Sequence, residues 1–70
     1  MPSKPLRNEH LRDYEVRVHR ADGTLSLVML IAAGGDHDAR SQAQDMLRDG
    51  MATAHIWRAG KFVASVYASD

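Results

Sequence analysis

Two stretches of alternating apolar residues, each interrupted near its middle by a glycine, constrain the fold of this 70-residue chain more than any other feature. The first stretch covers residues 14–32 around Gly23, and the second covers residues 52–67 around Gly60. Alternation with a period of two is typical of half-buried β-strands, and a glycine between two such runs indicates a hairpin turn. Because a short amphipathic segment separates the stretches, the pattern predicts a hairpin, a helix and a second hairpin.

The first hairpin is expected to turn at Asp22 and Gly23. A two-residue type I′ turn needs positive φ at both central positions, and Asp-Gly is one of the pairs that supply it. A three-residue loop ending at Gly23 would place Val18 opposite Ser26 and turn Leu27 away from the core, so the buried face favours the shorter turn. The resulting register predicts three apolar pairs on one face: Val18 with Leu27, Val16 with Met29, and Tyr14 with Ile31.

The second hairpin is expected to use a three-residue loop, Arg58-Ala59-Gly60. A two-residue turn would force Ala59 into positive φ, which is uncommon for a residue other than glycine, and would place Arg58 opposite Lys61. The longer loop instead puts Gly60 at the left-handed bulge position. Its register predicts three further pairs: Ile56 with Phe62, Ala54 with Ala64, and Ala52 with Val66.

The segment between the hairpins predicts one helix over residues 36–49. Asp36 is the expected N-cap, and Gly50 is the expected left-handed C-cap. The apolar positions form a narrow stripe with helical spacing: Ala39, Ala43, Met46 and Leu47. A helix with so narrow a stripe is expected to cover one face of a sheet.

These elements predict one α+β domain over residues 13–70, preceded by a flexible polar tail over residues 1–12. A right-handed crossover that places the first strand between the second and third gives a mainly antiparallel ββαββ sheet of order 2-1-3-4. An order of 1-2-3-4 with a parallel central pair is the alternative. The face under the helix is expected to carry Tyr14, Val16, Val18, Leu27, Met29, Ile31, Ile56, Phe62 and Val66.

The opposite face has no cover within the chain, and it is the candidate interaction face. It is expected to expose roughly 300–500 Å² of apolar area, a size that often marks an interaction site. Its candidate contact residues are Arg17, Val28, Leu30, His55, Trp57, Lys61, Val63 and Tyr67. A chain this short, with no cysteine for a disulfide, has little core of its own. A homodimer through this face or a sheet edge is therefore predicted, with Leu30 and Met51 at the margin of the contact; a monomer with Lys61 lying over Trp57 is the alternative.

Histidines on the uncovered face raise the question of a metal. His19 and His55 are expected on neighbouring strands, where they could hold a divalent ion together with Glu15. The chain has no HxH or HExxH spacing, however, and the aspartates at residues 36 and 38 are better explained by helix capping than by ligand binding. No motif joins a nucleophile to a base and an orienting group. No metal, cofactor or enzymatic activity is therefore predicted.

Charge and hydropathy distinguish among the remaining functional classes, which are nucleic-acid binders, membrane or secreted proteins, and interaction modules. A formal net charge of zero argues against a dedicated nucleic-acid binder. Trp57 and Tyr67, with Arg17 and Lys61, could nevertheless stack single-stranded bases on the sheet. No apolar run approaches the ~20 residues of a membrane span, and the first residues have no apolar stretch typical of a secretory signal, so a cytoplasmic protein is expected. The sequence thus predicts a self-associating interaction or structural module, with possible protein partners; the alternative is a single-stranded nucleic-acid-binding or regulatory protein.

One resemblance covers residues 14–66. The chain combines a Tyr-led first strand, Tyr14-x-Val16-x-Val18, with an Asp-Gly turn and an alanine-containing helix closing near Gly50. The last hairpin has the pattern Ile56-Trp57-x-x-Gly60-x-x-Val63-Ala64. In these features the chain resembles a set of short uncharacterised bacterial ββαββ proteins. The resemblance implies a bacterial origin and this fold, and it assigns no activity and no functional residues.

Overall fold

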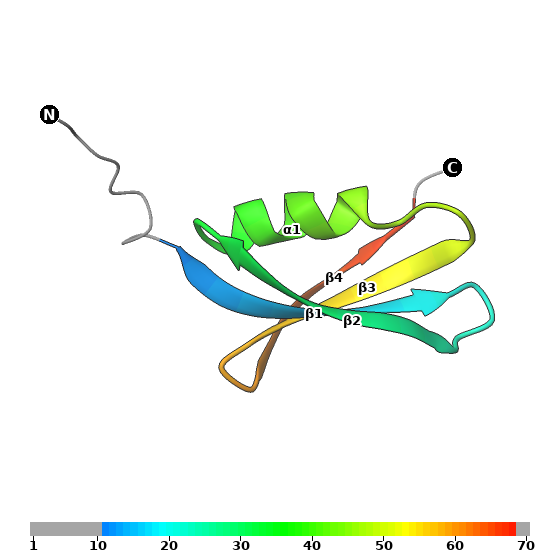
Figure 1. The fold of residues 1–70 in the computed structure, drawn as a ribbon, viewed down its shortest axis with the longest axis horizontal. Coiled ribbons are helices and arrows are strands. Elements are labelled where there is room, and N and C mark those ends of the chain that lie inside the picture. The colour runs from blue at the N-terminus through cyan, green and yellow to red at the C-terminus, as the bar shows by residue number, and fades with distance from the viewer. Residues whose placement is uncertain (1–10, 69–70) are drawn as a thin grey trace, which may run out of the picture.

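The structure, a computed structural model, describes residues 11–68. The elements follow in the order β1 (Arg12–Arg20), β2 (Leu25–Ala33), α1 (Asp36–Asp45), β3 (Met51–Arg58) and β4 (Lys61–Tyr67). The strands form one antiparallel sheet in the order β2-β1-β3-β4, and α1 lies over one face of it (Figure 1). The predicted α+β class, element order and strand order are confirmed. The predicted tail lies outside the described residues except for Leu11 and Arg12, and Arg12 already belongs to β1.

The core lies between α1 and the sheet. The central strands β1 and β3 supply its largest side chains, because they are flanked by other strands on both sides. Alanines on the inner side of α1 let the helix backbone approach the sheet closely. The buried residues are Tyr14, Val16, Val18, Ala33, Ala39, Ala43, Ala54, Ile56 and Val66.

The predicted burial of Leu27 and Met29 in β2 is wrong, since both side chains are exposed. The helix has ten residues and β2 has nine, so α1 is about 15 Å long beside a strand of about 30 Å. The helix begins just after β2 ends, and Ile31 and Ala33 near that end are covered. A helix of this length cannot also cover the first part of β2.

The helix starts one residue earlier than predicted. Gly35 is the N-cap residue, and Asp36 is the first helical residue. The carboxylate of Asp36 accepts a hydrogen bond from the Tyr14 hydroxyl at 2.8 Å and makes no side-chain cap. A carboxylate oxygen of Asp38 accepts the backbone N–H of Gly34 at 2.8 Å. Both carboxylates still lie in the first turn, where the helix dipole favours negative charge.

The helix also ends earlier than predicted. Its C-cap is Met46, so Gly50 does not cap it. Asp49 and Gly50 both have positive φ, at 56° and 91°, and form the turn that leads into β3. The backbone N–H of Met51 donates to the carbonyl of Arg48 across this turn. Gly50 is thus needed for its left-handed conformation, at the entry to a strand.

The first hairpin has a three-residue loop and not the predicted type I′ turn. Arg20 donates to the Thr24 carbonyl at 2.9 Å and accepts from the Gly23 N–H at 2.9 Å. Gly23 has a φ of 91°, whereas Asp22 is not left-handed. The carboxylate of Asp22 accepts hydrogen bonds from the backbone N–H and the hydroxyl of Thr24, which lower the pKa of Asp22.

The predicted core register of this hairpin is nevertheless confirmed. A β-bulge at Ser26 absorbs the residue that the longer loop shifts. Val18 pairs with Leu27, Val16 with Met29 and Tyr14 with Ile31. The loop length and the register are therefore independent in this hairpin, because the bulge separates them.

The second hairpin departs from the prediction in the opposite sense. It has a two-residue turn, with Ala59 at φ 53° and Gly60 at φ 79°, and Arg58 pairs with Lys61. A bulge at Val63 places Trp57 opposite Phe62 and Ile56 opposite Ala64. Ala54, not Ala52, pairs with Val66. The predicted register is wrong by two residues, because the bulge allows the short turn and still keeps Val66 on the core side.

Ala59→Asn is expected to stabilise the protein by about 0.5–1 kcal/mol, because asparagine tolerates the left-handed conformation that Ala59 adopts. The melting temperature should rise by about 2–8 °C in a domain of this size, as measured by circular dichroism. Ala21→Asn, in the other hairpin loop at a position without positive φ, is the matched control and should give no such rise. Equal effects of the two substitutions would contradict the proposed relief of strain.

Candidate functional site

The outer strand β2 carries the largest group of exposed apolar side chains among the described residues. Its nine-residue sequence, LSLVMLIAA, has no charged residue. We use the term β2 surface for the five large exposed apolar side chains of this strand. Their exposed fractions are 52% for Leu25, 36% for Leu27, 50% for Val28, 45% for Met29 and 76% for Leu30.

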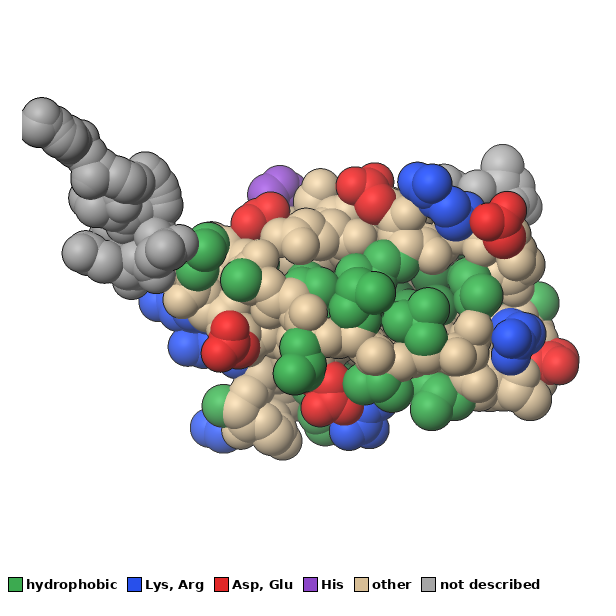
Figure 2. Space-filling view, viewed as in Figure 1, with side chains coloured by type: hydrophobic (Ala, Val, Ile, Leu, Met, Phe, Trp, Pro, Cys, Tyr) green, Lys and Arg blue, Asp and Glu red, His purple; other side chains and the backbone are tan. Residues whose placement is uncertain are grey.

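The β2 surface occupies both faces of the sheet. Leu27 and Met29 pair with buried residues of β1 and lie on the side of α1. Val28 and Leu30 alternate with them and point to the other side. Figure 2 shows hydrophobic side chains gathered beside α1 on the face that it displays. Since both sides of one strand are apolar and exposed, this strand differs from an ordinary half-buried edge strand.

The other outer strand, β4, has features that block strand pairing. It begins with Lys61 and is interrupted by the bulge at Val63. Charged residues and bulges are common means by which proteins keep a sheet edge from pairing with another chain. In β2 the only bulge lies near the start, at Ser26, and leaves residues 27–33 regular. The edge that is open to pairing is therefore that of β2.

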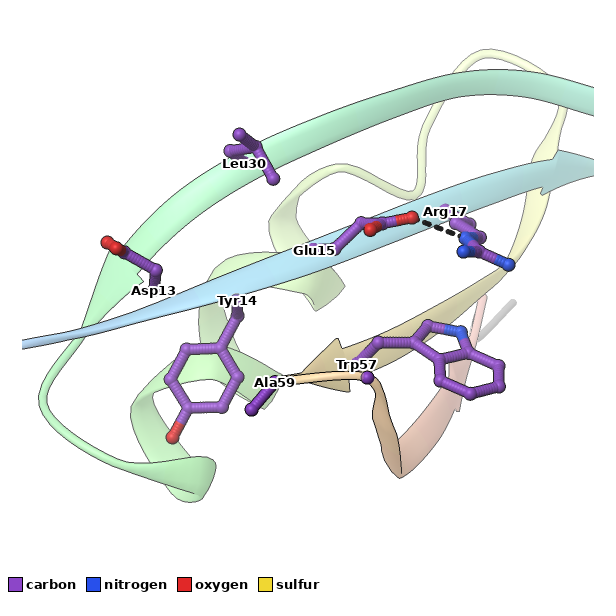
Figure 3. Close-up of a pocket in the computed structure, with 8 residues that line it drawn as sticks. Asp13, Tyr14, Glu15, Arg17, Leu30, Trp57 and Ala59 are labelled. Carbon is purple, nitrogen blue, oxygen red and sulfur yellow. Dashed lines mark hydrogen bonds and ion pairs between the residues drawn. The ribbon is translucent and has the colours of Figure 1, made fainter.

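The open face, by which we mean the face of the sheet opposite α1, carries an aromatic and charged cluster. The guanidinium group of Arg17 lies 5.0 Å from the centre of the Trp57 ring and forms an ion pair with Glu15. Phe62 meets Trp57 edge-on at 5.5 Å. Figure 3 shows Glu15 and Arg17 of β1 directed toward each other beside the indole of Trp57. The positive charge over the indole comes from Arg17 and not, as the sequence alternative had it, from Lys61.

The candidate interaction residues are divided by the structure. Six lie on the open face: Arg17, Val28, Leu30, His55, Trp57 and Tyr67. Lys61 pairs with Arg58 and so alternates to the side of α1. Val63 and Met51 are half-buried and pack against the core.

Phe62 is the open-face residue that the sequence analysis missed. It had been assigned to the core by the three-residue loop, and its exposed fraction is 53%. The signal that could have located it is the direct cross-strand pairing of two aromatic side chains, Trp57 and Phe62, which stabilises antiparallel strands.

A shallow hollow of about 410 Å³ lies beside this cluster. Glu15, Arg17, Leu30 and Trp57 line part of it. The Glu15 carboxylate and the Arg17 guanidinium group in it are paired with each other, and Asp13 also lines the hollow. Leu30 makes the hollow continuous with the β2 surface.

The two histidines of the open face lie next to each other. The ring centres of His19 and His55 are 5.0 Å apart, and the rings are tilted by 42°. The Nδ1 atom of His19 is buried and has no hydrogen-bond partner among the described residues. No group of three or more His, Cys, Asp or Glu side chains in residues 11–68 is arranged to hold a metal ion.

Comparisons of the chain with protein-family models, with curated proteins and with solved structures found no match. Within the part of the chain that the structure describes, no helix has the length and apolar character needed to cross a membrane. The function is therefore inferred from the β2 surface and the open face.

Proposed function

We propose that this protein is a self-associating interaction module in which β2 of one copy pairs with β2 of a second copy. The observation that carries the proposal is the exposure of aliphatic side chains on both faces of this one outer strand. The proposal describes a binding role without catalysis. It includes a cytoplasmic location, which the lack of cysteine favours weakly.

Edge pairing explains the position of these side chains better than packing on one face does. A partner lying on the open face would cover Val28 and Leu30 but leave Leu27 and Met29 in water. A strand added beside β2 contacts the side chains on both faces at once. It also pairs the outer backbone N–H and C=O groups of β2, as in other complexes formed by strand addition.

The area involved is sufficient for a weak homodimer. The five side chains are on average about half exposed, so they present on the order of 400 Å² per copy and roughly 800 Å² in a pair. Newly paired backbone and neighbouring side chains bring the total to about the 1,000 Å² of a small specific interface. The uncharged sequence of β2 means that two copies can meet without opposing like charges.

Sedimentation velocity tests the proposal directly. The weight-average mass should rise from that of a monomer toward that of a dimer as the concentration increases through the micromolar range. A constant monomer mass across that range, with the thermal unfolding transition independent of concentration, would overturn it.

A second candidate function is the binding of single-stranded nucleic acid to the open face. The observation that favours it is the stacking of Arg17 on Trp57 beside two exposed aromatic rings, Phe62 and Tyr67. Base stacking on such side chains contributes about 1–3 kcal/mol per base. The guanidinium group of Arg17 is already paired with Glu15 and so offers no free positive charge to phosphate, which ranks this function second.

A low-salt titration with mixed-sequence single-stranded RNA and DNA checks this second function. If it operates, binding should weaken as salt rises, and Tyr67→Ala should reduce the affinity about tenfold. The absence of a complex at high micromolar protein would remove the candidate.

A further inference from the structure

The register of the central strands brings two imidazole rings together on the open face. His19 of β1 pairs with Thr53 of β3, and Arg17 pairs with His55. His19 and His55 are therefore diagonal neighbours on adjacent strands, with ring centres 5.0 Å apart. Both belong to central strands, whose backbone is hydrogen-bonded on both sides.

This separation suits a metal ion with tetrahedral geometry. A zinc ion bound by imidazole lies about 2.1 Å from the nitrogen, and hence about 3.2 Å from the ring centre. Two ring centres at that distance from one ion, and 5.0 Å from each other, subtend an angle of about 100°, close to the tetrahedral value. We propose that His19 and His55 together bind a borderline divalent cation, Zn²⁺, with water completing the coordination.

The state of His19 supports the proposal independently of the distance. Its Nδ1 atom is buried and has no hydrogen-bond partner among residues 11–68. A buried polar atom without a partner is destabilising, because it has lost its hydrogen bonds to water. A bond to a metal ion would use the lone pair of this atom without breaking a hydrogen bond among the described residues.

The neighbouring groups select the class of metal. Thr53 opposite His19 and Ser65 opposite His55 bring neutral hydroxyl groups to the same two rows of the open face. Glu15, the carboxylate nearest to these rows on β1, is paired with Arg17. Imidazole without free carboxylate suits Zn²⁺ and Cu²⁺, whereas Mg²⁺ and Ca²⁺ require oxygen ligands.

The charge of Arg17 has to be considered, because this residue pairs directly with His55. Its guanidinium group is held by the Glu15 carboxylate and by the Trp57 ring. The ion pair neutralises its charge, so a dication beside the imidazoles meets a neutral pair. Two protein ligands and water predict micromolar rather than nanomolar affinity.

Isothermal titration of the full chain with Zn²⁺ tests the site, with Mg²⁺ as the comparison ion. Zn²⁺ should bind at one ion per chain, and His19→Gln and His55→Gln should each weaken binding at least tenfold. His37→Gln, on the exposed side of α1, is the matched control and should leave the affinity unchanged. Circular dichroism of each variant shows whether the fold is retained.

Trp57 provides a second readout, since it is the only tryptophan of the chain and its ring contacts Phe62, which also contacts His55. Cu²⁺ as a probe should quench its fluorescence in the wild type and in His37→Gln, but not at the same concentration in His55→Gln. Zinc binding that survives both open-face substitutions in folded protein, or that His37→Gln abolishes, would overturn the proposal. A monomeric wild type that still binds Zn²⁺ would remove the proposed self-association and leave this site standing.

Discussion

Met29→Lys is expected to abolish self-association at concentrations where the wild type is dimeric. If two copies of β2 pair antiparallel over their full length, Met29 at the middle of one strand lies opposite Met29 of the second copy. Each substitution removes the burial of a large apolar side chain, worth about 1.5–3 kcal/mol, and brings two like charges together. The dissociation constant measured by sedimentation equilibrium should rise by about 10²–10⁴-fold.

Tyr67→Lys is the matched control for this experiment. Tyr67 is 65% exposed on β4, the other outer strand, and its replacement adds the same charge. The control should keep the wild-type dissociation constant. Leu30→Lys, at the most exposed position of the β2 surface, should reproduce the effect of Met29→Lys. A loss of association in Tyr67→Lys, without one in the two β2 variants, would place the interface on β4.

Tyr14→Ala is expected to unfold most of the protein. The Tyr14 side chain is 1% exposed and is the largest that is fully buried. Truncating a buried aromatic residue costs about 3–5 kcal/mol, and a domain of this size has a total stability of roughly 4–10 kcal/mol. Urea unfolding followed by circular dichroism should show a midpoint near zero denaturant, or no folded baseline.

Tyr14→Phe separates the ring from the hydroxyl group. It keeps the packing and removes only the hydrogen bond to Asp36, so the loss should be about 1 kcal/mol. Asp36 is exposed and can be hydrated after the change, which limits the loss. An equal effect of the two substitutions would show that the hydroxyl, and not the packed ring, carries the stability.

The stability of the wild type and that of Tyr14→Phe should depend differently on pH in alkaline solution. Burial raises the pKa of Tyr14 above its usual value of 10.0, and the hydrogen bond to Asp36 raises it further. Because the folded state favours the neutral phenol, this stability is complete below the unfolded pKa and is lost as the pH rises toward the folded pKa. The unfolding free energy of wild type should therefore fall more steeply above pH 10 than that of Tyr14→Phe.

The two hairpins show why turn chemistry alone did not predict their loops. Asp22-Gly23 suits a type I′ turn, yet the loop there has three residues; Ala59 resists positive φ, yet it adopts a φ of 53°. In each strand pair a bulge, at Ser26 or at Val63, restores the alternation between the faces. The core face therefore constrained only whether the combined number of loop and bulge residues is odd or even, and left the loop length free.

One of the two candidate sites on the open face could be predicted from the sequence, and the other could not. Alternation and strand order were enough to bring His19 and His55 to adjacent strands of one face. The contact of Arg17 with Trp57, and not of Lys61, depends on the register of β4 and on the ion pair with Glu15. The Arg17–Trp57 contact therefore depends on side-chain positions in three strands. A local sequence pattern describes one strand at a time and cannot predict it.

By itself, the amino-acid sequence determined the four strands, their order and the buried side of β1 and β3, because period-two alternation and hairpin connectivity permit few arrangements. The exposure of β2 on both sides, in contrast, follows from how α1 packs on the sheet. A helix of ten residues, starting beside the end of β2, cannot cover the full length of a nine-residue strand. Coverage depends on the relative length and placement of two packed elements, and neither quantity can be read from the periodicity of either one.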